Sequence, residues 1–251
     1  MSMNLDVRGW RSLCLAGMVL LLGGCTATHN GAAVVSPPVK EVPPRSSHPG
    51  TTPPSISPVV LDYFLEIAFG SEYGLGDYTI KKWKKDVRIG LIGDPTEADR
   101  RTVEKVVATL NDLLNPILQV KIVDNREANL HVYFIPQAEF YKYEPPGLVF
   151  NRGFFWAWWN GIGEIHRARV VVASDGLTQR QRSHLIWEEL TQALGLMNDS
   201  LKYPDSIFYQ EYSETLGYSS LDRAVIRLLY DPRILPGMRQ FEVRDRLAGA
   251  P

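Results

Sequence analysis

The sequence predicts one domain of the α/β (α+β) class, a twisted mixed sheet packed against a long helix and a second helix. Apolar stretches typical of strands occur at residues 87–92, 118–123, 129–135 and 164–173. Two segments with helical signals, residues 94–114 and 179–194, alternate with these strands. Another helical segment follows at residues 220–230, so we expect a mostly helical C-terminal part.

The first 24 residues have the composition of a targeting signal. Arg8 and Arg11 supply its positive charge, residues 13–22 are apolar, and Leu-Gly-Gly-Cys ending at Cys25 fits a bacterial lipobox. We expect cleavage before Cys25 and acylation of this residue, because several acyl chains on one residue anchor a protein stably in a membrane. Thr26 stands where Asp would indicate inner-membrane retention, which favours the outer membrane, facing the periplasm.

Residues 25–57 are rich in Pro, Ser, Thr and Gly and indicate a semi-extended tether, since this composition buries too little apolar surface to fold. The folded domain then comprises residues 58–251. The chain has two cysteines, Cys14 inside the signal and Cys25 under the lipid, so we expect neither a disulfide nor a thiolate metal site. A formal net charge of −1 argues against nucleic acid as a partner.

The folded domain is expected to begin with a helix over residues 58–69, ended by Gly70, and a turn over residues 72–77. The basic run at residues 81–85 indicates a solvated edge. After the strand at residues 87–92, the helix of residues 94–114 is closed by Pro116. Two strands and a Pro/Gly-interrupted loop lead to the aromatic run 154–159, whose Trp156, Trp158 and Trp159 are by default core residues.

The second helix carries a polar stripe that a buried helix does not need for packing. Thr178 can cap its start, and Gly195 suits its end, because glycine adopts the left-handed conformation without strain. At 100° per residue, His184, Glu188 and Gln192 lie on one stripe, whereas Glu189 lies beside it. This arrangement indicates a functional site on the helix.

The run Glu188-Glu189-Leu-Thr-Gln-Ala-Leu-Gly195-Leu-Met-Asn198 resembles His-Glu-x-x-His-x-x-Gly-x-x-His of zinc metallopeptidases in the metzincin branch of the zincins. The resemblance implies a zincin-like fold, with Glu189 as general base. It also places Glu188, Gln192 and Asn198 at the three metal-ligand positions, with Asp199 as an alternative to Asn198 and His184 one turn away as a further candidate.

The resemblance continues beyond this helix. Tyr-Pro-Asp-Ser-Ile-Phe-Tyr, ending at Tyr209, resembles the Met-turn of matrixins, with Phe208 in place of the methionine. The resemblance implies that Gly195, Ser206, Phe208 and Tyr209 lie at the turn and the cleft. The segment 220–230 resembles the last matrixin helix. Together these motifs resemble a proteobacterial lipoprotein family, domain of unknown function 2927, over residues 58–240.

Four hypotheses for function follow. Replacement of two imidazoles by Glu188 and Gln192 leaves an all-oxygen donor set that suits harder ions better than Zn²⁺. The first hypothesis is therefore a non-peptidase that binds a peptide or protein along an edge at the strand 164–173, with Glu188, Gln192 and Asn198 bonded to the Met-turn-like loop. The second is an atypical metal-dependent hydrolase, with Glu189 as base and a divalent metal on Glu188, Asp199 and His184 or His166.

The third hypothesis, a metal-free acid–base pair, requires Glu188 and Glu189 to converge, yet neighbouring helical residues point about 100° apart. In the fourth, the domain is a structural part of envelope assembly that makes contact through Trp156, Trp158 and Trp159. His131 and His166 are expected to be packing or capping residues. We favour the first hypothesis, and whether the protein is an enzyme or needs a cofactor stays open at this point.

Overall fold

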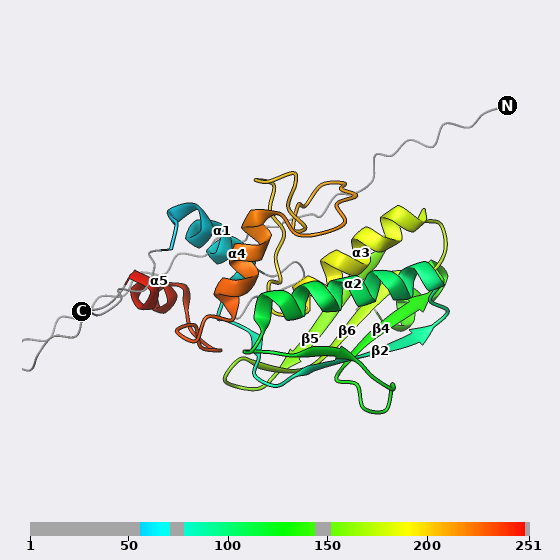
Figure 1. Cartoon of the computed structure of the whole chain (residues 1–251), viewed down its shortest axis with the longest axis horizontal. Helices are drawn as coiled ribbons and strands as arrows, with labels where there is room; N and C mark the ends of the chain where they lie inside the picture. Colours follow the sequence, from blue (N-terminus) through cyan, green and yellow to red (C-terminus); the bar gives the residue numbers. More distant parts are fainter. Residues whose placement is uncertain (1–55, 71–77, 144–151, 249–251) are drawn as a thin grey trace, which may run out of the picture. The chain divides into compact units, whose positions relative to one another are not determined.

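A six-stranded sheet lies at the centre of the computed structural model, which describes residues 56–70, 78–143 and 152–248. The strands lie in the order β1-β6-β4-β2-β3, with β5 paired to β6 (Figure 1). Their bounds are Lys82–Trp83 for β1, Val87–Gly93 for β2, Val120–Ile122 for β3, Leu130–Ile135 for β4, Gly153–Trp159 for β5 and Glu164–Ala173 for β6. The β5–β6 pair is antiparallel and the others are parallel.

The signal segment, Cys25, the tether and the turn expected at residues 72–77 lie outside the described residues. The described residues fall in one compact unit. Within residues 56–70, 78–143 and 152–248, no helix has the length and apolar character needed to span a membrane.

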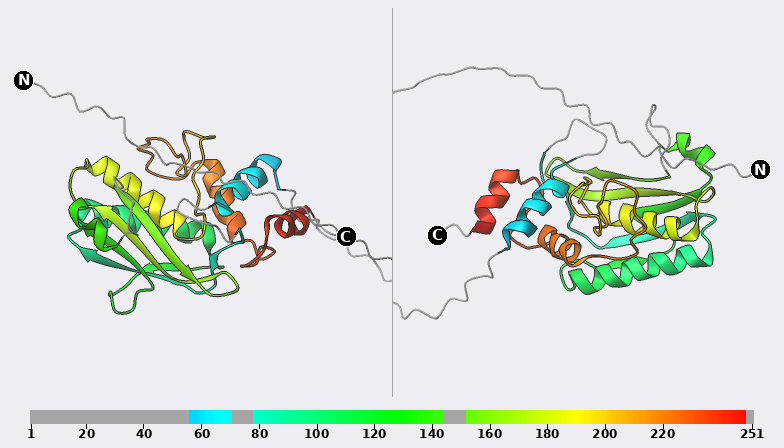
Figure 2. Two further views of the ribbon diagram at one scale, coloured as in Figure 1. Left: turned by 180° about the vertical axis from the view of Figure 1, so that it is seen from behind. Right: turned by 90° about the horizontal axis from the view of Figure 1, so that it is seen from above.

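Helices α2 and α3 lie side by side on one face of the sheet (Figures 1 and 2). The helices are α1 Pro58–Ala68, α2 Glu97–Leu114, α3 Gln179–Gln192, α4 Ser220–Leu229 and α5 Gln240–Ala248, with a 3-10 helix, η1, at Gln137–Lys142. The expected α/β class is therefore confirmed, as is the order of strand, long helix, strands and second helix. The helical C-terminal part is confirmed by α4 and α5.

The main core lies between the sheet and the pair α2 and α3. Val103, Val106 and Leu110 of α2 recur every three or four residues and are fully buried, because this spacing places them on one face of a helix. A second, smaller cluster lies on the other face of the sheet, where Phe140 of η1 packs against Phe154 of β5. This cluster covers only part of that face.

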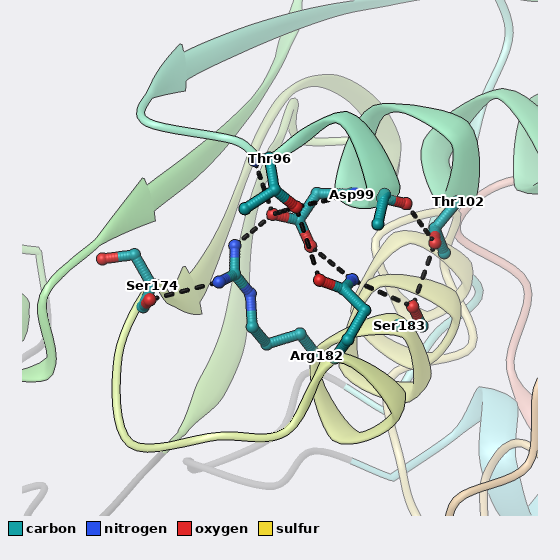
Figure 3. Close-up of polar contacts among 8 residues, drawn as sticks. Thr96, Asp99, Thr102, Ser174, Arg182 and Ser183 are labelled. Carbon is teal, nitrogen blue, oxygen red and sulfur yellow. Dashed lines mark hydrogen bonds and ion pairs between the residues drawn. The ribbon is translucent and has the colours of Figure 1, made fainter.

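Buried polar contacts join the N-terminal ends of α2 and α3 (Figure 3). Asp99 closes the capping box of α2 with Thr96, and its carboxylate also accepts from the Arg182 guanidinium of α3 and from Gln179 Nε2 at 2.8 Å. Arg182 Nη1 donates to the Ser174 carbonyl oxygen at 3.1 Å. Asp99 is fully buried, so this pair of charges depends on partners supplied by both helices.

The basic run 81–85 is only partly exposed, and the solvated edge expected there is wrong for its first half. Lys81, Lys82 and Trp83 are buried, whereas Lys84 and Lys85 are exposed. Lys82 Nζ donates to the carbonyl oxygens of Leu229 at 2.9 Å and Ile234 at 2.6 Å, so it caps the C-terminal end of α4. Burial lowers the pKa of Lys82 to about 8.

The edge of the sheet is not where the sequence places it. β6, residues 164–173, has β5 on one side and β4 and β1 on the other, so it is an inner strand. The aromatic run forms β5, which pairs with β6 alone among the described strands and thus forms the edge next to α3. Trp156 and Trp158 are half-buried and Trp159 is exposed, so the expectation that these residues are core is also wrong.

Candidate functional site

Helix α3 is held at both ends. Thr178 accepts from the backbone N–H of Gln181, and the Gln181 side chain accepts from the Thr178 N–H in return, so a capping box fixes the first turn. The helix ends at Gln192, two residues before the predicted end. Beyond it, Trp83 Nε1 donates to the Ala193 carbonyl at 3.0 Å and the Tyr230 hydroxyl to the Leu194 carbonyl at 3.0 Å. The polar stripe is therefore presented by a rigid element.

His184 and Glu188 face each other on the stripe. His184 Nδ1 lies 2.8 Å from the Thr215 carbonyl oxygen, which accepts only, so Nδ1 carries a proton. The other ring nitrogen, Nε2, lies 3.4 Å from Glu188 Oε2, an arrangement that favours the imidazolium ion. Burial opposes this charge, but Glu188, the Thr215 carbonyl and the more distant Glu214 together raise the pKa of His184.

This raised pKa predicts that His184 stabilises the fold less as the pH rises. The imidazolium contribution is fully present below the unfolded-state pKa of 6.5 and is lost as the pH passes through the higher folded-state pKa. We expect the free energy of unfolding of the wild type to exceed that of His184→Gln by an amount that shrinks from pH 6 upward, measured by urea denaturation at a series of pH values. A difference that stays constant or grows with pH would contradict the His184–Glu188 ion pair.

The remaining proposed ligand positions also have partners within the chain. Gln192 Nε2 donates to Asp199 Oδ1 at 2.6 Å. Asn198 Nδ2 donates to the carbonyl oxygens of Glu66 at 3.2 Å and Asp199 at 3.0 Å, so it joins the segment after α3 to the C-terminal end of α1. Glu188 is therefore paired with His184, Gln192 with Asp199, and Asn198 with α1. The predicted bonds from these three side chains to the Met-turn-like loop are wrong.

Glu189 points in a different direction from Glu188. It is buried, and its Oε1 lies 3.1 Å from the position that a Cβ atom would take on Gly153, the first residue of β5. The absence of a side chain at Gly153 therefore leaves space for this carboxylate beside the edge strand. Because Glu188 faces His184 and Glu189 faces β5, the two do not form a carboxylate pair, as the helical geometry predicts.

The Met-turn-like segment has a buried polar centre. Ser206 Oγ donates to Asp222 Oδ1 at 2.6 Å and accepts from the Tyr63 hydroxyl at 2.7 Å and from the Phe208 N–H at 3.1 Å. Burial is the main reason why the pKa of Tyr63 lies far above its usual range. Ser206 and Phe208 are thus structural residues of this turn, while half-buried Tyr209 donates to Glu211 at 3.0 Å.

Residues 211–217, here called the covering segment, pack against the first half of α3. Gln181 Nε2 donates to the Tyr212 hydroxyl at 3.1 Å, Arg180 pairs with Glu214 at 2.9 Å, and Thr215 accepts from His184. A hollow of only about 10 Å³ is left between the covering segment and α3. The sequence shows no periodicity here that would have predicted this contact.

The donors on α3 do not fit Zn²⁺. Across residues 56–70, 78–143 and 152–248, no three His, Cys, Asp or Glu side chains lie close enough together to hold a metal ion. The one imidazole of the stripe, His184, has its two nitrogens directed at Thr215 and Glu188. His166 on β6 is exposed, and His131 Nε2 on β4 donates to the Asn125 carbonyl at 3.1 Å, so neither joins the stripe.

Comparisons with known proteins add a family. No curated protein matches the chain. Two solved structures of myroilysin are similar to it, both with a TM-score of 0.40. The first is 14% identical and covers 66% of this chain and 92% of its own. The second is 13% identical and covers 62% of this chain and 100% of its own. Such similarity carries no information about the site. The family described as "Protein of unknown function (DUF2927)" matches residues 59–249, and the chain belongs to this family.

Proposed function

We propose that this protein is a lipid-anchored component of the cell envelope whose domain binds an extended peptide or protein segment at the outer edge of β5 without hydrolysing it. The observation that carries the proposal is the position of β5, an edge strand next to the polar helix α3. Cys25 would supply the anchor, and the tether after it would hold the domain away from the membrane.

The backbone of β5 has hydrogen-bonding groups to offer on its outer side. The Ala173 N–H donates to the Arg152 carbonyl at 2.9 Å, so this pair is a hydrogen-bonded pair of the antiparallel ladder. Because such pairs alternate along the ladder, the N–H and C=O groups of Gly153, Phe155 and Ala157 point away from β6. No described residue bonds to them, and an unpaired edge of this kind accepts an additional strand.

The edge is rigid where a partner would pair. Phe155 and Ala157 are buried against α3, and this packing fixes the position and twist of the strand. Glu189 lies beside Gly153 at the start of the edge. Because Glu188 faces His184 and Gln192 donates to Asp199, the arrangement supports binding and offers no donor set for metal-assisted hydrolysis.

The substitution Ala157→Pro tests this proposal. Proline removes one outward N–H and is tolerated on an edge strand whose N–H faces away from the sheet, so the fold should persist. Peptides would be selected on the full chain in detergent from a random library displayed on phage, and their affinities measured by calorimetry. We expect a loss of about tenfold or more in Ala157→Pro, corresponding to about 1.4 kcal/mol, and wild-type affinity in Ala157→Ser, which keeps the N–H.

Failure to select any peptide, or equal binding by Ala157→Pro and the wild type, would contradict binding at this edge, provided that thermal melts show folded variants.

The second candidate function is hydrolysis with Glu189 as base, which is favoured by the position of this buried carboxylate beside the edge strand. The selected peptides therefore also serve as substrates. Cleavage by the wild type that Glu189→Gln abolishes would establish the hydrolase instead of the binding module.

A further inference from the structure

A second surface lies on the opposite face of the sheet from α2 and α3. A hollow of about 190 Å³ opens there over β4, β5 and β6. The hollow, here called the arginine hollow, is lined by His131, Tyr133, Trp158, Arg167, Ala168 and Arg169. None of these residues is acidic.

The two guanidinium groups of the arginine hollow are held against aromatic rings. Arg167 Cζ lies 4.1 Å from the centre of the Trp158 ring. Arg169 Cζ lies 5.4 Å from Trp158 and 5.2 Å from Tyr143, and Arg169 Nη1 donates to the Tyr143 carbonyl at 3.1 Å. Cation–π contacts of this kind orient a guanidinium group while leaving N–H donors at its edge for a ligand.

Both charges lack a counter-ion within the described part of the chain. Neither Arg167 nor Arg169 forms an ion pair there, whereas other arginines, such as Arg101 and Arg233, do. Two adjacent guanidinium groups without a carboxylate form a strong site for an oxyanion, because each can donate two parallel N–H bonds to it. The charge of the arginine hollow is thus complementary to a carboxylate or phosphate group.

The aromatic rings indicate what carries the anion. Trp158 is half-buried and lies 6.4 Å from Trp156, ring centre to ring centre, so two indole rings continue from the arginines along the open face of β5. A flat apolar ring next to a charged donor suits a sugar ring, whose C–H groups can pack on the part of the Trp156–Trp158 indole pair that Arg167 does not cover. The volume is below the roughly 300–1,000 Å³ of sites that enclose a drug-sized ligand, so the hollow suits a single small unit.

We propose that the arginine hollow binds an acidic sugar, with its carboxylate or phosphate accepting from Arg167 and Arg169 and its ring packed on Trp158. This proposal depends on other groups than the peptide-binding proposal: it uses the side chains of Arg167, Arg169 and Trp158, whereas the peptide would bond to the outward backbone groups of β5, here called the peptide edge. The sugar can be free or part of a larger glycan, since the hollow is open to solvent at Arg167.

Calorimetric titration of the full chain in detergent with glucuronate, glucose 6-phosphate and glucose tests the proposal. We expect saturable binding of at least one of the two acidic sugars and none of glucose. Arg167→Gln should weaken binding about tenfold or more, corresponding to about 1.4 kcal/mol. Arg100→Gln, on the exposed side of α2, should leave it unchanged. Thermal melts identify any variant that fails to fold, and Trp158→Leu then provides an independent second variant with the same expected loss.

Acetate and inorganic phosphate form the last arm of the test. If they bind as tightly as the acidic sugars, the hollow recognises only the oxyanion and the packing on Trp158 is wrong. No binding of either acidic sugar, binding of glucose with equal affinity, or wild-type affinity in Arg167→Gln would each overturn the proposal. None of these results bears on Ala157→Pro, so this site and the peptide edge can fail separately.

Discussion

Replacement of Arg182 by Met is expected to lower the free energy of unfolding by about 3–5 kcal/mol, the usual cost of removing one partner from a buried ion pair. Arg182 and Asp99 are both buried, and their contact joins α3 to the start of α2 (Figure 3). The methionine would leave the Asp99 carboxylate with Gln179 Nε2 and the Thr96 cap as partners but without a compensating charge. An uncompensated charge in this position is more costly than the loss of a surface contact.

Urea denaturation of the full chain measures this effect, with Arg101→Met as the matched control. Arg101 also belongs to an Arg–carboxylate pair near the start of α2, with Glu97 at 3.1 Å, but both side chains of this pair are largely exposed. Exposed pairs contribute little, so the control should stay within about 0.5 kcal/mol of the wild type. Equal effects in Arg182→Met and Arg101→Met would show that the contact between α2 and α3 does not depend on the buried charge.

The sequence predicts α3 and its stripe well because the information is local. Thr178 and Gln181 form the capping box within four residues, and the spacing of His184 and Glu188 places them on one face whatever surrounds the helix. That His184 would also contact the Thr215 carbonyl does not follow from spacing, since Thr215 is more than 30 residues away. Of the candidate ligand residues, His184, Glu188 and Gln192 lie on α3 and Asn198 and Asp199 follow it. The contacts of His184 with Thr215 and of Asn198 with Glu66 are tertiary.

The identity of the edge strand could not be read from the sequence for a related reason. The pattern of β6 suits either an inner or an outer position, and only pairing with β4 and β5 distinguishes them. The aromatic run that forms β5 is expected from the sequence to be core. In the fold, Phe155 and Ala157 face α3, whereas Trp156 and Trp158 lie on the open face beside Arg167. An aromatic side chain satisfies both environments.

Lys82 shows how charge misleads in the same way. Four lysines in a five-residue run predict solvent exposure, yet Lys82 extends to the carbonyls of Leu229, the last residue of α4, and of Ile234, about 150 residues later in the chain. The last carbonyl groups of a helix have no partner within the helix, and an ammonium group has three N–H donors. A buried lysine can therefore bond to several such carbonyls at once. Trp83 next to it takes the corresponding role at the end of α3. The short strand β1 therefore connects the ends of two helices, which no local pattern indicates.

The same junction makes Gly195 the position at which a small substitution should have a large effect. Its φ is +119°, and an added Cβ would lie 2.0 Å from the Lys81 carbonyl oxygen, a backbone atom of the chain leading into β1. Gly195→Ala therefore combines a left-handed conformation, costing roughly 1–2 kcal/mol, with displacement of packed backbone, costing roughly 1–3 kcal/mol. We expect the free energy of unfolding to fall by about 2–5 kcal/mol.

Gly161→Ala is the matched control for this prediction, because an added Cβ there meets no atom within 4 Å and the backbone is not in the left-handed region. The control should be neutral or slightly stabilising, since alanine reduces the entropy of the unfolded chain. The displacement in Gly195→Ala should also reach Trp83 and the end of α3. The tryptophan fluorescence of this variant should therefore differ from that of the wild type even well below the melting temperature. If Gly195→Ala is as stable as Gly161→Ala, the close approach of the Lys81 carbonyl does not require glycine at position 195, and the position of the end of α3 does not depend on this contact.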